Sequence, residues 1–66
     1  MIAPGQLRRW TSAGTDHGKL FLVLEHSPFP LYTGMVDDGC TIMESGSEPF
    51  WEETEHIEES SEEVTQ

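Results

Sequence analysis

The sequence predicts a small all-β domain, built as an antiparallel sheet of four to five short, strongly bent strands. Short apolar runs are separated every few residues by turn residues, which is typical of an all-β domain. The longest apolar run, residues 20–24, is short for a helix and suits a strand. The chain of 66 residues is long enough for one domain with a modest core.

The first two strand candidates flank a polar loop. Pro4-Gly5 predicts a turn, and residues 6–10 after it are a short strand whose inward residue is expected to be Leu7. Residues 11–18 are polar and glycine-bounded, which predicts a loop. Residues 19–25 are the strongest strand candidate, because their apolar run is short and sharply bounded.

The middle of the chain predicts a hairpin. Residues 27–30 hold two prolines, which place them in a loop or at a sheet edge. Residues 31–36 are the next strand candidate, followed by Asp-Asp-Gly at 37–39. Because Asp-Gly tolerates positive φ, this pair predicts a tight turn with residues 40–44 as the return strand.

One more turn and strand complete the predicted sheet. Residues 45–47 are a Ser-Gly-Ser turn, and 48–51 form a short final strand or an aromatic plug. At this size, such a sheet usually takes the form of an SH3-like antiparallel β-barrel. We therefore expect residues 1–51 to form a small barrel domain.

Residues 52–66 are expected to be an acidic C-terminal extension. Glutamate favours helix, but glutamates three and four residues apart place like charges on one helical face. We expect one docked turn over residues 51–57 and a disordered end from about Ser60. Arg8 and Arg9 point to opposite faces of a strand, and one of them is expected to pair with this segment.

The negative charge is concentrated in the last third of the chain. Thirteen acidic residues against three Lys and Arg give a formal net charge of −10, and nine of the acidic residues lie in 44–66. DNA, RNA and anionic membranes would repel such a chain, so we expect no direct nucleic-acid partner and no membrane. The charge favours a basic protein instead.

No targeting or membrane segment is predicted. No basic stretch precedes an apolar run at the N-terminus, and no apolar run approaches the ~20 residues that a membrane helix needs. The single cysteine, Cys40, has no partner for an internal disulfide. We therefore expect a cytoplasmic protein.

The turn residues carry a resemblance. Pro4-Gly5 before a strand, then Gly18-Lys19 before an apolar strand, resembles the opening of small SH3-like and KOW-type barrels. The Asp-Gly pair and the Phe50-Trp51 with glutamates after it resemble small bacteriophage and cyanophage proteins with an acidic C-terminus. The resemblance implies a phage-encoded protein in the host cytoplasm. Three basic residues cannot supply the basic face of nucleic-acid-binding KOW domains, so that activity is not implied.

The acidic residues are the main candidate for a binding site. Carboxylates three or four residues apart on a helix, or two apart on a strand, lie roughly 5–7 Å apart, close to the spacing of DNA phosphates. Such a surface can occupy the basic cleft of a DNA-binding protein, and the alternative is a solvated segment that only confers solubility. The candidate partner-binding residues are Asp37, Asp38, Glu48, Trp51, Glu52, Glu53, Glu55, Glu58 and Glu59.

The aromatic residues are numerous for this length. They form either the core or a hot-spot patch that faces a partner, and a small barrel favours the core. Trp10 and Trp51 cannot easily both be interior, so we expect one of them to be exposed.

No catalytic, metal or cofactor site is predicted, and we expect the protein not to be an enzyme. The turn explains Asp37 and Asp38 without a catalytic role. The three histidines and Cys40 lack the spacing of a zinc site, and nothing supplies an oxyanion hole for a Cys nucleophile.

These observations favour a non-enzymatic protein-binding module. We expect a phage-encoded inhibitor that mimics DNA and occupies a basic host protein, such as a nucleoid-associated protein, a nuclease or part of the transcription machinery. One alternative is a small virion component that docks through Trp10, Trp51 and an edge strand. Another is a non-catalytic subunit of a larger enzyme complex. Exposed sheet edges also permit a homodimer through strand pairing.

Overall fold

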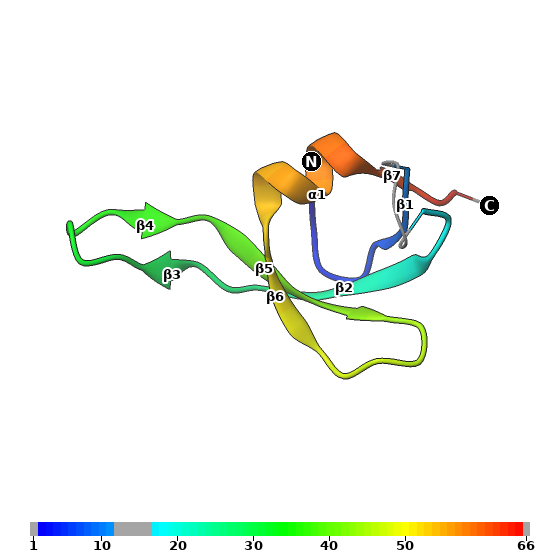
Figure 1. Cartoon of the computed structure of the whole chain (residues 1–66), viewed down its shortest axis with the longest axis horizontal. Coiled ribbons are helices and arrows are strands. Elements are labelled where there is room, and N and C mark those ends of the chain that lie inside the picture. Colours follow the sequence, from blue (N-terminus) through cyan, green and yellow to red (C-terminus); the bar gives the residue numbers. More distant parts are fainter. Residues whose placement is uncertain (1, 12–16, 66) are drawn as a thin grey trace.

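The computed structural model describes residues 2–11 and 17–65. It contains a five-stranded antiparallel sheet, a separate two-stranded ribbon and one short helix (Figure 1). The predicted all-β class is confirmed. Most of the loop predicted over 11–18 falls outside the described residues. Within the described part of the chain, no helix combines the length and apolar character needed to cross a membrane.

The main sheet is built from β1 (Leu7–Trp10), β2 (Leu20–His26), β5 (Gly39–Glu44), β6 (Phe50–Glu53) and β7 (Ser61–Glu63). Its strand order is β6-β5-β2-β1-β7. Strands β1, β2, β5 and β6 are neighbours in chain order, as in a meander, and β7 returns to pair with β1. The helix α1 (Thr54–Ser60) joins β6 to β7, which stand at opposite ends of this order, and contacts both. Closure into a barrel would require β6 to pair with β7, and the described strand pairings do not include this pair.

The core gathers between the sheet and α1. Trp10 and Phe21 stack with their ring centroids 4.4 Å apart, and the Trp10 indole N–H donates to the Glu44 carboxylate at 2.7 Å. Ile57 is 0 % exposed and anchors α1 to this cluster. The buried apolar residues of the described chain are Trp10, Phe21, Val23, Cys40, Ile42 and Ile57.

Strand β1 turns the opposite face inward from the one expected. Leu7 is 38 % exposed, whereas Arg8 and Trp10 are buried, so the prediction of Leu7 as the inward residue is wrong. Side chains alternate along a strand, and burial of the large Trp10 ring carries Arg8 to the same face. The Arg8 guanidinium is satisfied there, because it donates to the Ser61 hydroxyl at 2.8 Å and to the Ser61 carbonyl at 3.1 Å.

The hairpin turn also lies elsewhere than expected. The chain runs from β4 (Val36–Asp37) directly into β5, while β4 pairs with β3 (Phe29–Pro30) as an outward continuation of the β2–β5 pair. Figure 1 shows this ribbon extending away from the rest of the fold. Its turn is at 31–35, where the Leu31 N–H donates to the Met35 carbonyl at 2.9 Å and Gly34 has φ +81°. The predicted strand over 31–36 and the Asp38-Gly39 turn are therefore wrong.

Other turn predictions agree with the structure. Gly46 has φ +82° in the turn at 45–47, and the Ser47 N–H donates to the Glu44 carbonyl at 3.1 Å. The two prolines near 27–30 do mark a sheet edge, because Pro30 lies in the two-stranded ribbon.

The acidic segment is part of the sheet. The sequence predicts disorder from about Ser60, whereas Ser61–Glu63 form β7 and pair with β1. The Arg9 guanidinium contacts the Glu62 carboxylate at 2.9 Å, so the expected pairing of an arginine with this segment is confirmed. The docked turn expected near Ile57 is a seven-residue helix.

Candidate functional site

Acidic side chains from two distant parts of the chain meet at one hollow. β5 pairs with β6 in a register that sets Gly39 opposite Glu53, and the Thr54 N–H donates to the Asp38 carbonyl at 3.0 Å. The start of α1 is therefore fixed beside the junction of β4 and β5. The residues that line this hollow are Asp37, Asp38, Glu53, Thr54, Glu55 and Glu58.

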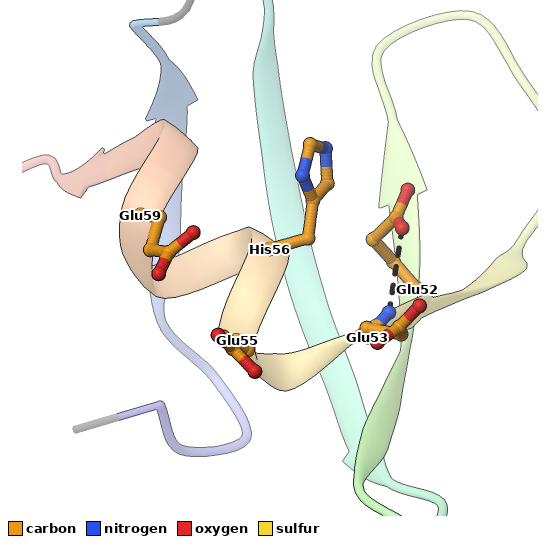
Figure 2. Close-up of a pocket in the computed structure, with 5 residues that line it drawn as sticks. All are labelled: Glu52, Glu53, Glu55, His56 and Glu59. Atoms are coloured by element: carbon orange, nitrogen blue, oxygen red, sulfur yellow. Dashed lines mark hydrogen bonds between the residues drawn. The ribbon is translucent and has the colours of Figure 1, made fainter.

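A second hollow continues the first around α1. Figure 2 shows Glu52 and Glu53 at the end of β6, with Glu55, His56 and Glu59 on the helix beside them. Glu53 and Glu55 line both hollows, so the two form one surface. We call it the acidic surface, and it consists of Asp37, Asp38, Glu52, Glu53, Glu55, Glu58 and Glu59.

The helix is held in place although its sequence is poor in helix-stabilising contacts. The Glu53 side chain makes no capping hydrogen bond, and no basic residue lies in the last turn. Glu55 in the first turn interacts favourably with the helix dipole. Glu58 and Glu59, three and four residues further along the helix, repel the Glu55 carboxylate. The burial of Ile57 and the strands on both sides therefore hold these carboxylates in position.

His26 contacts the acidic surface at its edge. Its Nε2 lies 2.5 Å from an Asp38 carboxylate oxygen. Two hydrogen bonds to the carboxylate hold the pKa of Asp38 below its ordinary value. The one from His26 has the larger effect, and the one from the Thr54 hydroxyl the smaller. Asp38 is therefore a stable anion at neutral pH. Arg8 and Arg9 are engaged elsewhere, on Ser61 and Glu62 of β7.

An apolar hollow adjoins the acidic surface. It is lined by Phe29, Leu31, Asp37 and Trp51, and Asp37 also lines the acidic hollow. The Trp51 indole N–H donates to the Ser27 carbonyl at 2.7 Å, and the ring lies 6.0 Å from that of Phe29. Phe29 is 56 % exposed and Leu31 is 45 % exposed. We call this feature the apolar socket.

The structure gathers most of the predicted site residues. Seven of the predicted carboxylates form the acidic surface, and Trp51 lies beside it in the apolar socket. Glu48 does not join them, because it lies in the turn between β5 and β6, at the other end of β6 from α1 (Figure 1).

Sequence reasoning missed the exposed apolar ribbon. The aromatic residues were expected mainly in the core, which holds for Trp10 and Phe21 but not for Phe29 and Tyr32. The prolines on both sides of Phe29 were the available signal, because a strand interrupted in this way cannot lie inside a sheet. The expectation that one tryptophan is exposed is met in part, since Trp51 is half-buried and Trp10 is buried.

Among the described residues, the histidine, cysteine and acidic side chains do not gather into a metal-binding cluster. No three His, Cys, Asp or Glu side chains of residues 2–11 and 17–65 are grouped so as to hold a metal ion. Cys40 is buried, with its sulfur 3.6 Å from the Thr54 hydroxyl.

Comparison with known proteins gave no relative: no family model, curated protein or solved structure matches this chain. The resemblance to phage proteins therefore remains a prediction from turn residues.

Proposed function

We propose that this protein is a non-enzymatic binding module whose acidic surface mimics DNA and occupies a basic surface of a DNA-binding protein. The observation that carries the proposal is the meeting of Asp37 and Asp38 with Glu53, Glu55 and Glu58 at one hollow. These carboxylates come from two segments that are distant in sequence, so the fold itself concentrates the charge.

The spacing of the carboxylates supports mimicry of phosphates. Glu58 and Glu59 lie three and four residues after Glu55 on α1, which places the Cβ atom of each roughly 5–6 Å from that of Glu55. Duplex DNA presents about one charge per 1.7 Å of axis over its two strands, so a basic cleft built for it meets several anions at such separations. Glu52, next to Glu53 at the end of β6, extends the surface.

The rigidity of the surface supports binding rather than simple solvation. α1 is anchored by Ile57 and followed by β7, which pairs with β1. A surface that is already ordered loses little conformational entropy on binding. A segment that served only to keep the protein soluble would not need this anchoring.

The partners that suit this surface share a basic DNA-binding cleft. Nucleoid-associated proteins, nucleases and transcription proteins are of this kind. If a phage encodes the protein, the partner would be a host protein and binding would inhibit it. The acidic surface would act in the same way in any organism.

Displacement of DNA tests the proposal. Purified nucleoid-associated proteins, nucleases and RNA polymerase are each bound to a fluorescent duplex, and the full-length chain is titrated in while the anisotropy is followed. We expect displacement from at least one of these proteins at low salt, weakening steeply as salt is raised. Failure to displace DNA from any of them would overturn the proposal.

Two charge-matched variants separate the acidic surface from net charge. The first carries Glu53→Gln, Glu55→Gln and Glu58→Gln, and we expect its displacement to weaken by about tenfold or more. The control carries Glu25→Gln, Glu48→Gln and Glu63→Gln, which lie outside the acidic surface and remove the same charge. Equal weakening of the two would show that net charge alone acts.

A second candidate function is apolar docking onto a particle. The exposed side chains of the β3–β4 ribbon favour it, because Tyr32, Met35 and Val36 are all more than half exposed. Trp10 cannot take part as expected, because it is buried. Such docking would be nearly independent of salt, which distinguishes it from occupation of a basic cleft.

A further inference from the structure

We propose that the apolar socket receives a single large apolar side chain from a basic segment of the partner, whose Lys and Arg neighbours lie over the acidic surface. This inference rests on the proposed function and specifies the partner's chemistry: an aromatic or long aliphatic anchor within a run of basic residues.

The socket has the form of a site for one side chain. Phe29, Leu31 and Trp51 form its walls, and its only polar lining residue among those described is Asp37. Phe29 and Leu31 are about half exposed in the free protein, so an occupant would remove their apolar surface from water. Isolated exposed apolar residues are ordinary, but three that line one hollow form a contiguous patch of the kind that marks an interaction site.

The socket wall is fixed before any partner arrives. The Trp51 ring lies against Gly39, where a side chain would overlap it, and its indole N–H is engaged by the Ser27 carbonyl. Large aromatic residues that are held in this way are typical centres of binding energy in protein interfaces.

The charge around the socket specifies the occupant. Asp37 lines both the apolar socket and the acidic hollow, so a residue next to the anchor in sequence would lie toward the hollow that Asp38 and Glu53 also line. Electrostatic complementarity therefore requires that residue to be Lys or Arg. A second copy of this chain fits poorly, because symmetric contact through this face would oppose two acidic surfaces, each on a chain of net charge −10.

The two tryptophans provide a built-in test by NMR. In a ¹⁵N-labelled sample the Trp51 indole N–H reports on the socket, while the Trp10 indole N–H, which donates to Glu44 in the core, is an internal control. Three unlabelled blocked peptides serve as probes: Lys-Lys-Trp-Lys-Lys, the same peptide with a central Ala, and Ser-Ser-Trp-Ser-Ser.

We expect the basic peptide with Trp to shift the Trp51 signal and leave the Trp10 signal in place. It should bind at least about fivefold more tightly than the basic peptide with Ala, because only the first buries an anchor. In the double variant Phe29→Ser and Leu31→Ser this advantage should disappear. In the control Met35→Ser, which alters an exposed ribbon residue outside the socket, it should remain.

The other outcomes separate this inference from the proposed function. Equal binding of both basic peptides, without a shift at Trp51, would overturn the socket and leave the acidic surface as the binding site. Binding of the Ser-flanked peptide as tightly as the Lys-flanked one would contradict a basic partner, and with it both proposals. A Trp51 shift that grows with protein concentration in the absence of peptide would identify a second copy as the occupant and overturn the inference. Absence of binding by all three peptides at millimolar concentration would also overturn it.

Discussion

The indole ring of Trp51 lies against the backbone of Gly39, its near neighbour on the adjacent strand. A Cβ atom built on Gly39 would overlap three atoms of this ring. Gly39 does not have a positive φ, so its role is close approach rather than turn formation. The contact joins β5 to β6 and sets the position of the socket wall.

Substitution Gly39→Ala should therefore destabilise the protein. The new methyl group must displace the Trp51 ring and break its hydrogen bond to Ser27, at a cost of about 1–3 kcal/mol in the free energy of unfolding. Urea denaturation measures the change. In a Trp51→Ala background the same substitution should cost far less, and an equal cost in both backgrounds would contradict the contact.

This contact also explains why the predicted hairpin is wrong. An Asp-Gly pair between apolar runs fits a tight turn by local rules. In the fold, β5 needs a residue without a side chain at position 39 so that the Trp51 ring can cross it. Gly34 supplies the positive φ of the true turn. Local sequence cannot distinguish these two uses of glycine, because the second depends on a residue twelve positions further along the chain.

Arg8 and Arg9 each contact β7, the first through a buried hydrogen bond to Ser61 and the second through an exposed ion pair with Glu62, so the two contacts can be compared. Ser61→Ala would leave the buried Arg8 Nε–H without its hydroxyl partner, and we expect a loss of about 1–3 kcal/mol in unfolding free energy. Arg9→Ala removes an exposed ion pair with Glu62 and should cost less than about 1 kcal/mol. Chemical denaturation of the two variants measures both, and an Arg9 effect as large as that of Ser61 would contradict this assignment.

The C-terminal segment shows which part of the fold the sequence does predict. The charge pattern located the acidic residues, and the spacing around Ile57 indicated a docked turn. Strand β7 escaped prediction because Ser61–Glu63 has no apolar residue. It forms because the edge of β1 that does not pair with β2 pairs with it, and because Ser61 supplies the hydroxyl and carbonyl acceptors for the buried Arg8 guanidinium. The acidic surface could likewise not be assembled from sequence, since Asp38 meets Thr54 only through the β5–β6 register.

Ile57 should carry much of the stability of the acidic segment. It is 0 % exposed, so Ile57→Val should cost about 0.5–1.5 kcal/mol and Ile57→Ala about 2–5 kcal/mol. A domain of this size rarely has more than about 3–5 kcal/mol to lose, so the Ala variant should be largely unfolded at room temperature. Thermal unfolding followed by circular dichroism measures the series.

Val36→Ala is the control for this series, because Val36 is 61 % exposed on the ribbon and should have almost no effect on unfolding. A stable fold in the Ile57→Ala variant would contradict the anchoring of α1. The same reasoning means that the acidic surface should be tested by substituting charges, since truncation after residue 51 would also remove Ile57 and β7.

The contact between His26 and Asp38 makes a pH-dependent contribution to stability. The folded-state pKa of Asp38 is lowered, first by the hydrogen bond from His26 and then by that from Thr54. The contribution is therefore fully present above the unfolded pKa of about 4 and is lost as the pH falls through the lower folded-state pKa. His26→Gln should raise the pKa of Asp38 toward its ordinary value, as measured by NMR titration of its carboxyl carbon. His56→Gln is the control, because His56 contacts Trp10 and Ser60 instead, and it should leave the Asp38 titration unchanged. An Asp38 titration that is the same with and without His26 would show that Thr54 alone lowers its pKa.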